Sequence, residues 1–388
     1  MKLFSDEEML RRVNNLKGIM DKNGFDLVIT SSFHSTLYYS GFWFLPMGRF
    51  SLTVFPIGGA PALIVPVMDR DRAEAASWIQ DKRFYGDEGA SLAAVIEQTK
   101  QVLSDRGVNA GKVGVEEDVI PQKMYRALVE SLPQSEFLDV STELMEQRLI
   151  KSEEEVQVLR TGCEISDVGT RVMMEAMAVG RTELEVSNEA LVAMDRELNQ
   201  RFPELESFGT LVTCNSGPRS LLPHGLSSGR RLRAGEVINF NVLPIIEGYY
   251  VSQERTLSLG PLPEAARKPY ETVVEAHQRG IEAVKPGIRC SDLARASLDV
   301  LKRDGYDQYQ LHGPGHSCGI MGAFWGREEK GEIRLYNDTV LQEGMVITVE
   351  PAIYVPGIGG FRHCDVLEVT KDGHELLTHY PRGILRAG

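Results

Sequence analysis

The chain has 388 residues, of which 42% are hydrophobic and 25% are charged, as in an ordinary globular protein. Its 42 Lys and Arg residues are outnumbered by 55 Asp and Glu residues, which gives a net charge of −13. An acidic surface repels phosphate backbones and anionic lipids, so nucleic acid and membranes are not expected as partners. One hydrophobic core rarely grows beyond about 250–300 residues, so the length predicts two domains.

The sequence also favours a cytoplasmic protein. No stretch approaches the roughly 18 apolar residues that a membrane span needs. The first residues, MKLFSDEEMLRR, lack the features of a secretory signal. The five cysteines are odd in number and widely spaced, so we expect reduced thiols.

The first part of the chain alternates between helical and strand patterns. A capping box, Ser5 to Glu8, begins a helix with apolar residues at helical spacing. Buried strands are predicted at 26–32, 51–57, 61–67 and 112–118, and a helix at 92–103. This alternation predicts a small α/β domain over residues 1–150.

A second capping box, Ser152 to Glu155, indicates the start of the second domain, residues 151–388. Amphipathic helices are predicted at 153–178, 182–200, 263–285 and 290–304. Between and after them lie strand-like runs at 236–244, 345–354 and 364–370. We therefore predict an α+β domain whose sheet is covered by helices.

Five segments of the second domain place ionisable residues inside apolar runs. These residues are His224, Glu254, His316, Glu350 and His363. Burying such groups costs several kcal/mol unless they are paired, so their recurrence predicts a functional site. Histidines and carboxylates first suggest metal ligands, although a buried salt bridge with Arg255 would also explain Glu254.

These segments resemble the signature segments of the pita-bread metallopeptidases, in which two Asp, one His and two Glu hold two divalent metals. In that register the five positions are Asn241, Ser252, His316, Glu350 and Cys364. Only His316 and Glu350 keep the expected ligand type, and hard dications need anionic oxygens. The sequence therefore predicts no two-metal centre, with a lone Zn²⁺ on His316 and Cys364 as an alternative.

The metal-free creatinase branch of that family is more similar. The resemblance rests on the runs TLYYSGF, MGRF, PIIEGYYVSQERTL, PGIRCSDLA, GPGHSCG and GMVITVEP. It implies a creatinase-like N-terminal domain and a pita-bread catalytic domain. It also implies a homodimer that hydrolyses creatine to sarcosine and urea without a cofactor.

The resemblance assigns roles to matching residues. His224 corresponds to the general acid–base group, a role that suits an imidazole because its pKa lies near neutrality. Glu254 and Glu350 correspond to the pair that holds the planar guanidinium group of the substrate. His316 corresponds to a histidine that orients the substrate or stabilises the tetrahedral adduct.

Further matches concern the carboxylate and the lining of the pocket. Arg49 and Arg327 correspond to arginines that bind the substrate carboxylate, and Arg49 would reach the pocket of the other subunit. Met47 stands where an aromatic residue covers the substrate. The remaining candidates for the pocket lining are His363, Cys364, Asn241 and Ser252.

Three other functions stay open on the sequence. One is hydrolysis or cleavage of another small zwitterion, such as the cyclic amidine ectoine. Another is an Xaa-Pro-type metallopeptidase, which stoichiometric metal would indicate. The third is an inactive scaffold, whose melting temperature creatine, sarcosine and ectoine would not raise.

Overall fold

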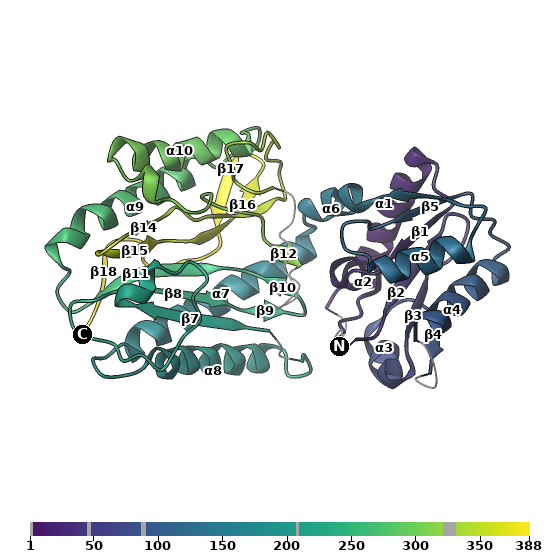
Figure 1. The fold of residues 1–388 in the computed structure, drawn as a ribbon, viewed down its shortest axis with the longest axis horizontal. Coiled ribbons are helices and arrows are strands. Elements are labelled where there is room, and N and C mark those ends of the chain that lie inside the picture. Colours follow the sequence, from purple (N-terminus) through teal and green to yellow (C-terminus); the bar gives the residue numbers. More distant parts are fainter. Residues whose placement is uncertain (1–2, 45–47, 87–90, 207–208, 321–330) are drawn as a thin grey trace. The chain divides into compact units, whose positions relative to one another are not determined.

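A computed structural model describes residues 3–44, 48–86, 91–206, 209–320 and 331–388 (Figure 1). Met47 and Arg327 lie outside the described residues. The chain divides into two compact units, Met1–Arg148 and Leu149–Gly388. The second capping box predicts this boundary near residue 150. In the described ranges, no helix combines the length and the apolar character that a membrane crossing requires.

The first unit is built on a six-stranded sheet of order β4-β3-β2-β1-β5-β6. Strands β1, β2 and β3 pair antiparallel, and the other neighbours pair parallel. The strands are β1 (Leu27–Thr30), β2 (Leu52–Pro56), β3 (Ala62–Pro66), β4 (Asp81–Tyr85), β5 (Lys112–Val115) and β6 (Glu136–Asp139). The helices are α1 (Asp6–Asn23), α2 (Phe33–Ser40), α3 (Arg70–Ala76), α4 (Ser91–Asp105), α5 (Gln122–Ser131) and α6 (Ser141–Leu149), with a 3-10 turn at Val67–Asp69.

Of the two hydrogen bonds of the capping box predicted for α1, one is observed. Ser5 Oγ accepts a hydrogen bond from the backbone N of Glu8 at 3.1 Å. The Glu8 carboxylate pairs instead with Arg11 at 2.7 Å and with Arg12 at 2.6 Å. The predicted reciprocal bond is thus replaced by ion pairs, because two arginines lie one turn further along the helix.

In its described ranges, the second unit combines four helices with several small sheets. Figure 1 shows the pairs α7–α8 and α9–α10 on opposite sides of the strands. The helices are α7 (Glu153–Ala176), α8 (Glu183–Arg201), α9 (Glu264–Ala283) and α10 (Cys290–Arg303), with 3-10 turns η2 (Gly217–Leu221) and η3 (Asp307–Tyr309). The strands are β7 (Leu211–Ser216), β8 (Val237–Leu243), β9 (Ile245–Ile246), β10 (Tyr249–Tyr250), β11 (Gln253–Leu259), β12 (Gly319–Ile320), β13 (Val346–Val349), β14 (Ala352–Val355), β15 (Gly359–Arg362), β16 (Asp365–Thr370), β17 (Gly373–Leu376) and β18 (Leu385–Ala387).

The four sheets have the orders β18-β11-β8-β7, β13-β16-β17, β12-β10-β9 and β14-β15. Both halves of the predicted capping box of α7 are present, at Ser152 and Glu155. The predicted α/β and α+β classes are confirmed.

Strand register in the second unit brings distant polar residues together. Glu254 in β11 pairs with Asn241 in β8. A bridge links Glu254 to Cys364, with N···O distances of 3.0 and 3.3 Å. Next to this bridge, Arg255 and Asp365 form a fully buried ion pair at 2.7 Å. Arg255 therefore forms its ion pair with Asp365 and contacts only the backbone carbonyl of Glu254, so the Glu254 carboxylate is left for the cavity described below.

Candidate active site

A cavity of about 450 Å³ opens in the second unit. Its wall combines β7, β8 and β11 with the loop after η2, the segment before β12, and the ends of β13 and β15. The lining residues are Leu211, Thr213, Pro223, His224, Gly225, Leu226, Asn241, Leu243, Tyr250, Ser252, Glu254, His312, Gly313, His316, Arg334, Glu350 and Arg362.

Six candidates from the sequence share this cavity, although they come from segments far apart in the chain. They are His224, Asn241, Ser252, Glu254, His316 and Glu350. Glu254 and Glu350 are buried, whereas His224 is exposed in a turn after η2. The cavity therefore combines a buried acidic floor with an imidazole that solvent can reach.

The guanidinium group of Arg362 lies between the two glutamates. Its Nε is 2.6 Å from Oε2 of Glu254, and its Nη1 is 3.5 Å from Oε1 of Glu350. Its Nη2 donates a hydrogen bond to Oδ1 of Asn241 at 2.5 Å. The contact with Glu254 is an ion pair without a directed hydrogen bond, because neither Nε nor Oε2 has a hydrogen-bond partner among the residues that the structure describes. Hydrogen-bonding capacity thus remains at the Glu254 oxygen.

The two carboxyl groups differ in their affinity for a proton. Burial raises the pKa of Glu254 well above its ordinary value; Arg362 opposes this effect and the negative charge of Glu350 adds to it. Burial also acts to raise the pKa of Glu350, but the hydrogen bond with His316 and the charge of Arg362 outweigh it, so this pKa is lowered. We therefore assign the proton of the pair to Glu254 and the negative charge to Glu350.

His316 connects the pair to the cavity wall. Its Nε2 lies 3.3 Å from Oε2 of Glu350. Its Nδ1 lies 3.0 Å from the carbonyl oxygen of Ser317 and 3.1 Å from the hydroxyl of Tyr250. A proton on Nε2 lets the neutral ring donate to the Glu350 carboxylate, and Nδ1 can then accept from the Tyr250 hydroxyl.

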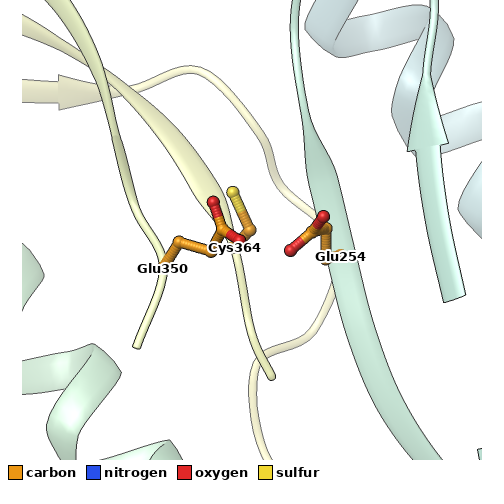
Figure 2. A group of neighbouring side chains, drawn as sticks. All are labelled: Glu254, Glu350 and Cys364. Carbon is orange, nitrogen blue, oxygen red and sulfur yellow. The ribbon is translucent and has the colours of Figure 1, made fainter. Parts of the chain in front are cut away.

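Glu254, Glu350 and Cys364 form one group of potential metal ligands within the described ranges. Their ligand atoms lie within 4.8 Å of one another, and Figure 2 shows Glu254 pointing toward the other two. Burial raises the pKa of the Cys364 thiol well above its ordinary value, and the nearby carboxylates add to this shift. Its Sγ donates to the carbonyl oxygen of Ser252 at 3.3 Å.

This donor set does not fit the two-metal centre of the resembling peptidases. The Asn241 oxygen is already bound by Arg362, and Ser252 and Cys364 offer a hydroxyl and a protonated thiol in place of carboxylates. The Arg362 cation already supplies positive charge between the glutamates. Two further dications would meet too few anionic oxygens to offset their charge.

Two further candidates are His363 and Arg49. His363 is fully buried, and its ring stacks on Tyr270 and lies 5.8 Å, between centroids, from His277. His363 is not among the residues that line this cavity. Arg49 belongs to the first unit, between α2 and β2.

The lining residues that were not predicted from the sequence include His312, Arg334 and Arg362. For Arg362 a signal exists, since it lies two residues before Cys364 and period two places both on one face of an extended chain. Burial lowers the pKa of His312, so its ring is held neutral beside the hydroxyl of Tyr354, which lies 3.0 Å from Nε2.

Comparison with known proteins agrees with the fold. Residues 12–150 match the creatinase/prolidase N-terminal domain, and residues 157–371 match metallopeptidase family M24. The creatinase of Bacillus sp. (strain B-0618) is 32% identical, with 98% of this chain and 92% of the relative covered. The Xaa-Pro dipeptidase of Pyrococcus furiosus is 30% identical, with 97% of this chain and 100% of the relative covered.

Solved structures show the same architecture. An Xaa-Pro dipeptidase from Bacillus anthracis superposes with a TM-score of 0.84 at 26% identity, covering 97% of this chain and 99% of that one. The prolidase of Pyrococcus horikoshii OT3 gives 0.81 at 28% identity, covering 96% and 99%. The chain belongs to metallopeptidase family M24, a family of hydrolases, and has a creatinase/prolidase N-terminal domain followed by a pita-bread domain.

Proposed function

We propose that this chain is a metal-independent hydrolase that cleaves a C–N bond in a small guanidino acid, most directly creatine, to give sarcosine and urea. The observation that carries the proposal is the position of Arg362. The two buried glutamates hold a guanidinium cation where the family's peptidases need carboxylates for metals.

Charge balance supports a cationic substrate. With both glutamates ionised, Arg362 offsets one of the two negative charges, and a buried excess charge is costly. A substrate guanidinium would offset the second charge and supply directed N–H donors to the Glu254 oxygen that lacks one. Until it arrives, the proton on Glu254 keeps the pocket close to neutral.

The proposed reaction needs one group that accepts and returns a proton. His224 would take a proton from water as the water oxygen attacks the guanidinium carbon. The bond from that carbon to the sarcosine nitrogen then breaks as His224 returns the proton to this nitrogen, and the hydroxyl proton left on the adduct passes to the same nitrogen as the urea C=O bond forms. Creatine and water thus become sarcosine and urea without net proton transfer to the enzyme. His316 would stabilise the adduct from the Glu350 side.

The remaining roles are proposed by resemblance. Arg49 and Arg327 would bind the substrate carboxylate, and Met47 would cover the substrate. A homodimer is proposed because Arg49 would act in the partner's pocket. We also propose a cytoplasmic enzyme without a cofactor.

A metal-dependent Xaa-Pro dipeptidase is the second candidate. The grouping of Glu254, Glu350 and Cys364 and the 30% identity to the Pyrococcus furiosus enzyme favour it. Loss of the Cys364 proton and displacement of Arg362 would both be needed before a metal could bind there.

A substrate panel separates the candidates. Purified enzyme is incubated with creatine, ectoine and Gly-Pro, and urea, ring-opened product and free proline are measured. The proposal predicts stoichiometric urea and sarcosine from creatine alone. Release of proline without urea would instead identify a dipeptidase, and turnover of ectoine alone would identify an amidine hydrolase.

A further inference from the structure

One buried carboxylate accepts hydrogen bonds from both ends of the loop that carries His224. Glu183 is the first residue of α8, and its side chain has no exposed surface. Its Oε1 accepts hydrogen bonds from the backbone N and Oγ of Ser216 at 2.9 and 2.8 Å. Its Oε2 accepts from the backbone N and Oγ of Ser228 at 3.0 and 2.7 Å. Loop 216–228 is therefore closed on a single side chain.

The middle of the loop is tied to the same carboxylate. Arg219 Nε donates to Oε2 of Glu183 at 3.0 Å, and Arg219 Nη2 donates to the carbonyl oxygen of Leu226 at 2.5 Å. Asn215 Nδ2 donates to the carbonyl oxygen of Gly225 at 2.7 Å. A Cβ at Gly225 would come within 2.2 Å of Asn215 Oδ1, so only glycine fits beside His224.

The His224 ring itself has no such support. It is exposed, and it makes no hydrogen bond to any other residue that the structure describes. A general acid–base group is normally oriented by a neighbouring donor or acceptor. Here the backbone of loop 216–228 is what determines where the imidazole lies.

Glu183 is suited to this task because it is ionised. Burial tends to raise its pKa, but the hydrogen bonds from Ser228 and Ser216 and the charge of Arg219 outweigh burial and lower the pKa. Hydrogen bonds to a charged acceptor are stronger than neutral ones. A glutamine there would keep one oxygen and turn an NH₂ group toward N–H and O–H donors.

We propose that Glu183 is a positioning residue for the reaction, which holds loop 216–228 so that His224 faces the bound substrate. This inference rests on the proposed role of His224. A displacement of about 1 Å of a catalytic group can cost roughly 100-fold in rate. Substrate binding at the glutamate pair should be spared, because Glu183 is not among the residues that line the cavity.

The test compares Glu183→Gln with Glu183→Asp and with Glu185→Gln. Glu185 lies on the same helix turn and completes its capping box with Thr182, but it is exposed and does not contact the loop. Turnover is measured on the substrate that the wild type cleaves in the panel above. Amide hydrogen exchange is measured over peptide 216–228.

We expect Glu183→Gln to lower kcat about 10–100-fold, with KM changed less than about threefold, and to speed exchange in the loop. Glu183→Asp should restore part of kcat because it keeps the charge. Glu185→Gln should keep kcat and loop exchange as in the wild type. Unchanged loop exchange in Glu183→Gln, or faster exchange with wild-type kcat, would overturn the inference. Amide exchange is measured without substrate. A wild-type enzyme that does not cleave creatine would therefore count against the proposed function but not against the role of Glu183 in holding the loop.

Discussion

The proton on Glu254 makes substrate binding depend on pH. Burial raises the pKa of Glu254 in the free enzyme, and a bound guanidinium would lower it again. Binding of a cationic substrate should therefore release a proton. Affinity should increase as pH rises toward the free-enzyme pKa and fall at lower pH.

Calorimetry in buffers of different ionisation enthalpy measures this proton directly. We expect proton release for the wild type, and little for Glu254→Gln, which has no proton to lose. Proton uptake on binding, or affinity that falls as pH rises, would show that Glu254 does not hold the cation.

His224→Ala should abolish most of the turnover and spare binding. Loss of a general acid–base group lowers kcat by about 10²–10⁴-fold. KM should stay near that of the wild type, because the glutamate pair is untouched. His379→Ala, an exposed histidine of the same unit, is the matched control and should keep full activity. A His224→Ala enzyme with a third of the wild-type kcat would remove this residue from the mechanism.

At the scale of elements, the amphipathic helices were predictable from periodicity. The predicted helices 153–178, 182–200, 263–285 and 290–304 agree with the bounds of α7 to α10 within about two residues. Helix α2 was not predicted, because all of its residues are buried and no polar face marks it. The predicted run 345–354 is split into β13 and β14, since Pro351 has no N–H with which to continue a ladder.

The site residues were predictable only where an ionisable residue interrupts an apolar run of the sequence. Glu254 and Glu350 are carboxylates inside apolar strands, so their presence in the cavity could be anticipated. The role of Arg362 could not, because its partners come from β8, β11 and the end of β13 and depend on register between strands. For His363, residue type alone does not say whether the side chain faces the cavity or the interior, where its ring contacts Tyr270.

The buried pair Arg255–Asp365 links β11 to β16 directly beside Glu254 and Cys364. Asp365 also accepts a hydrogen bond from Thr378 Oγ1 at 2.6 Å. Asp365→Asn leaves the Arg255 charge buried without its counter-ion, which should lower the free energy of unfolding by about 3–5 kcal/mol.

Urea denaturation measures this loss. The control is Glu275→Gln, which breaks the exposed pair with Arg303 at 2.7 Å and should cost less than about 1 kcal/mol. Equal losses in the two variants would show that the buried pair does not hold the strands together.

At the scale of the whole molecule, the proposed homodimer can be tested by mixing subunits. Arg49→Ala should raise KM more than it lowers kcat, as expected for a residue that binds a non-reacting carboxylate. Arg49→Ala and His224→Ala homodimers should each be impaired. Their heterodimer places both lesions in one pocket if Arg49 acts in the partner's pocket, and it should recover about half of the wild-type activity per dimer. Verified heterodimers without recovery would argue against a shared pocket.

Chelation tests the central claim most directly. Of the five positions where the family's peptidases bind metals, the described donor set keeps His316 and Glu350, but it has Asn241, Ser252 and a protonated thiol at the others and a guanidinium between the glutamates. Enzyme treated exhaustively with EDTA and dialysed should release urea from creatine at the untreated rate, and Mn²⁺ or Zn²⁺ should not raise that rate. Activity that disappears with EDTA and returns with Mn²⁺ or Zn²⁺ would contradict the account.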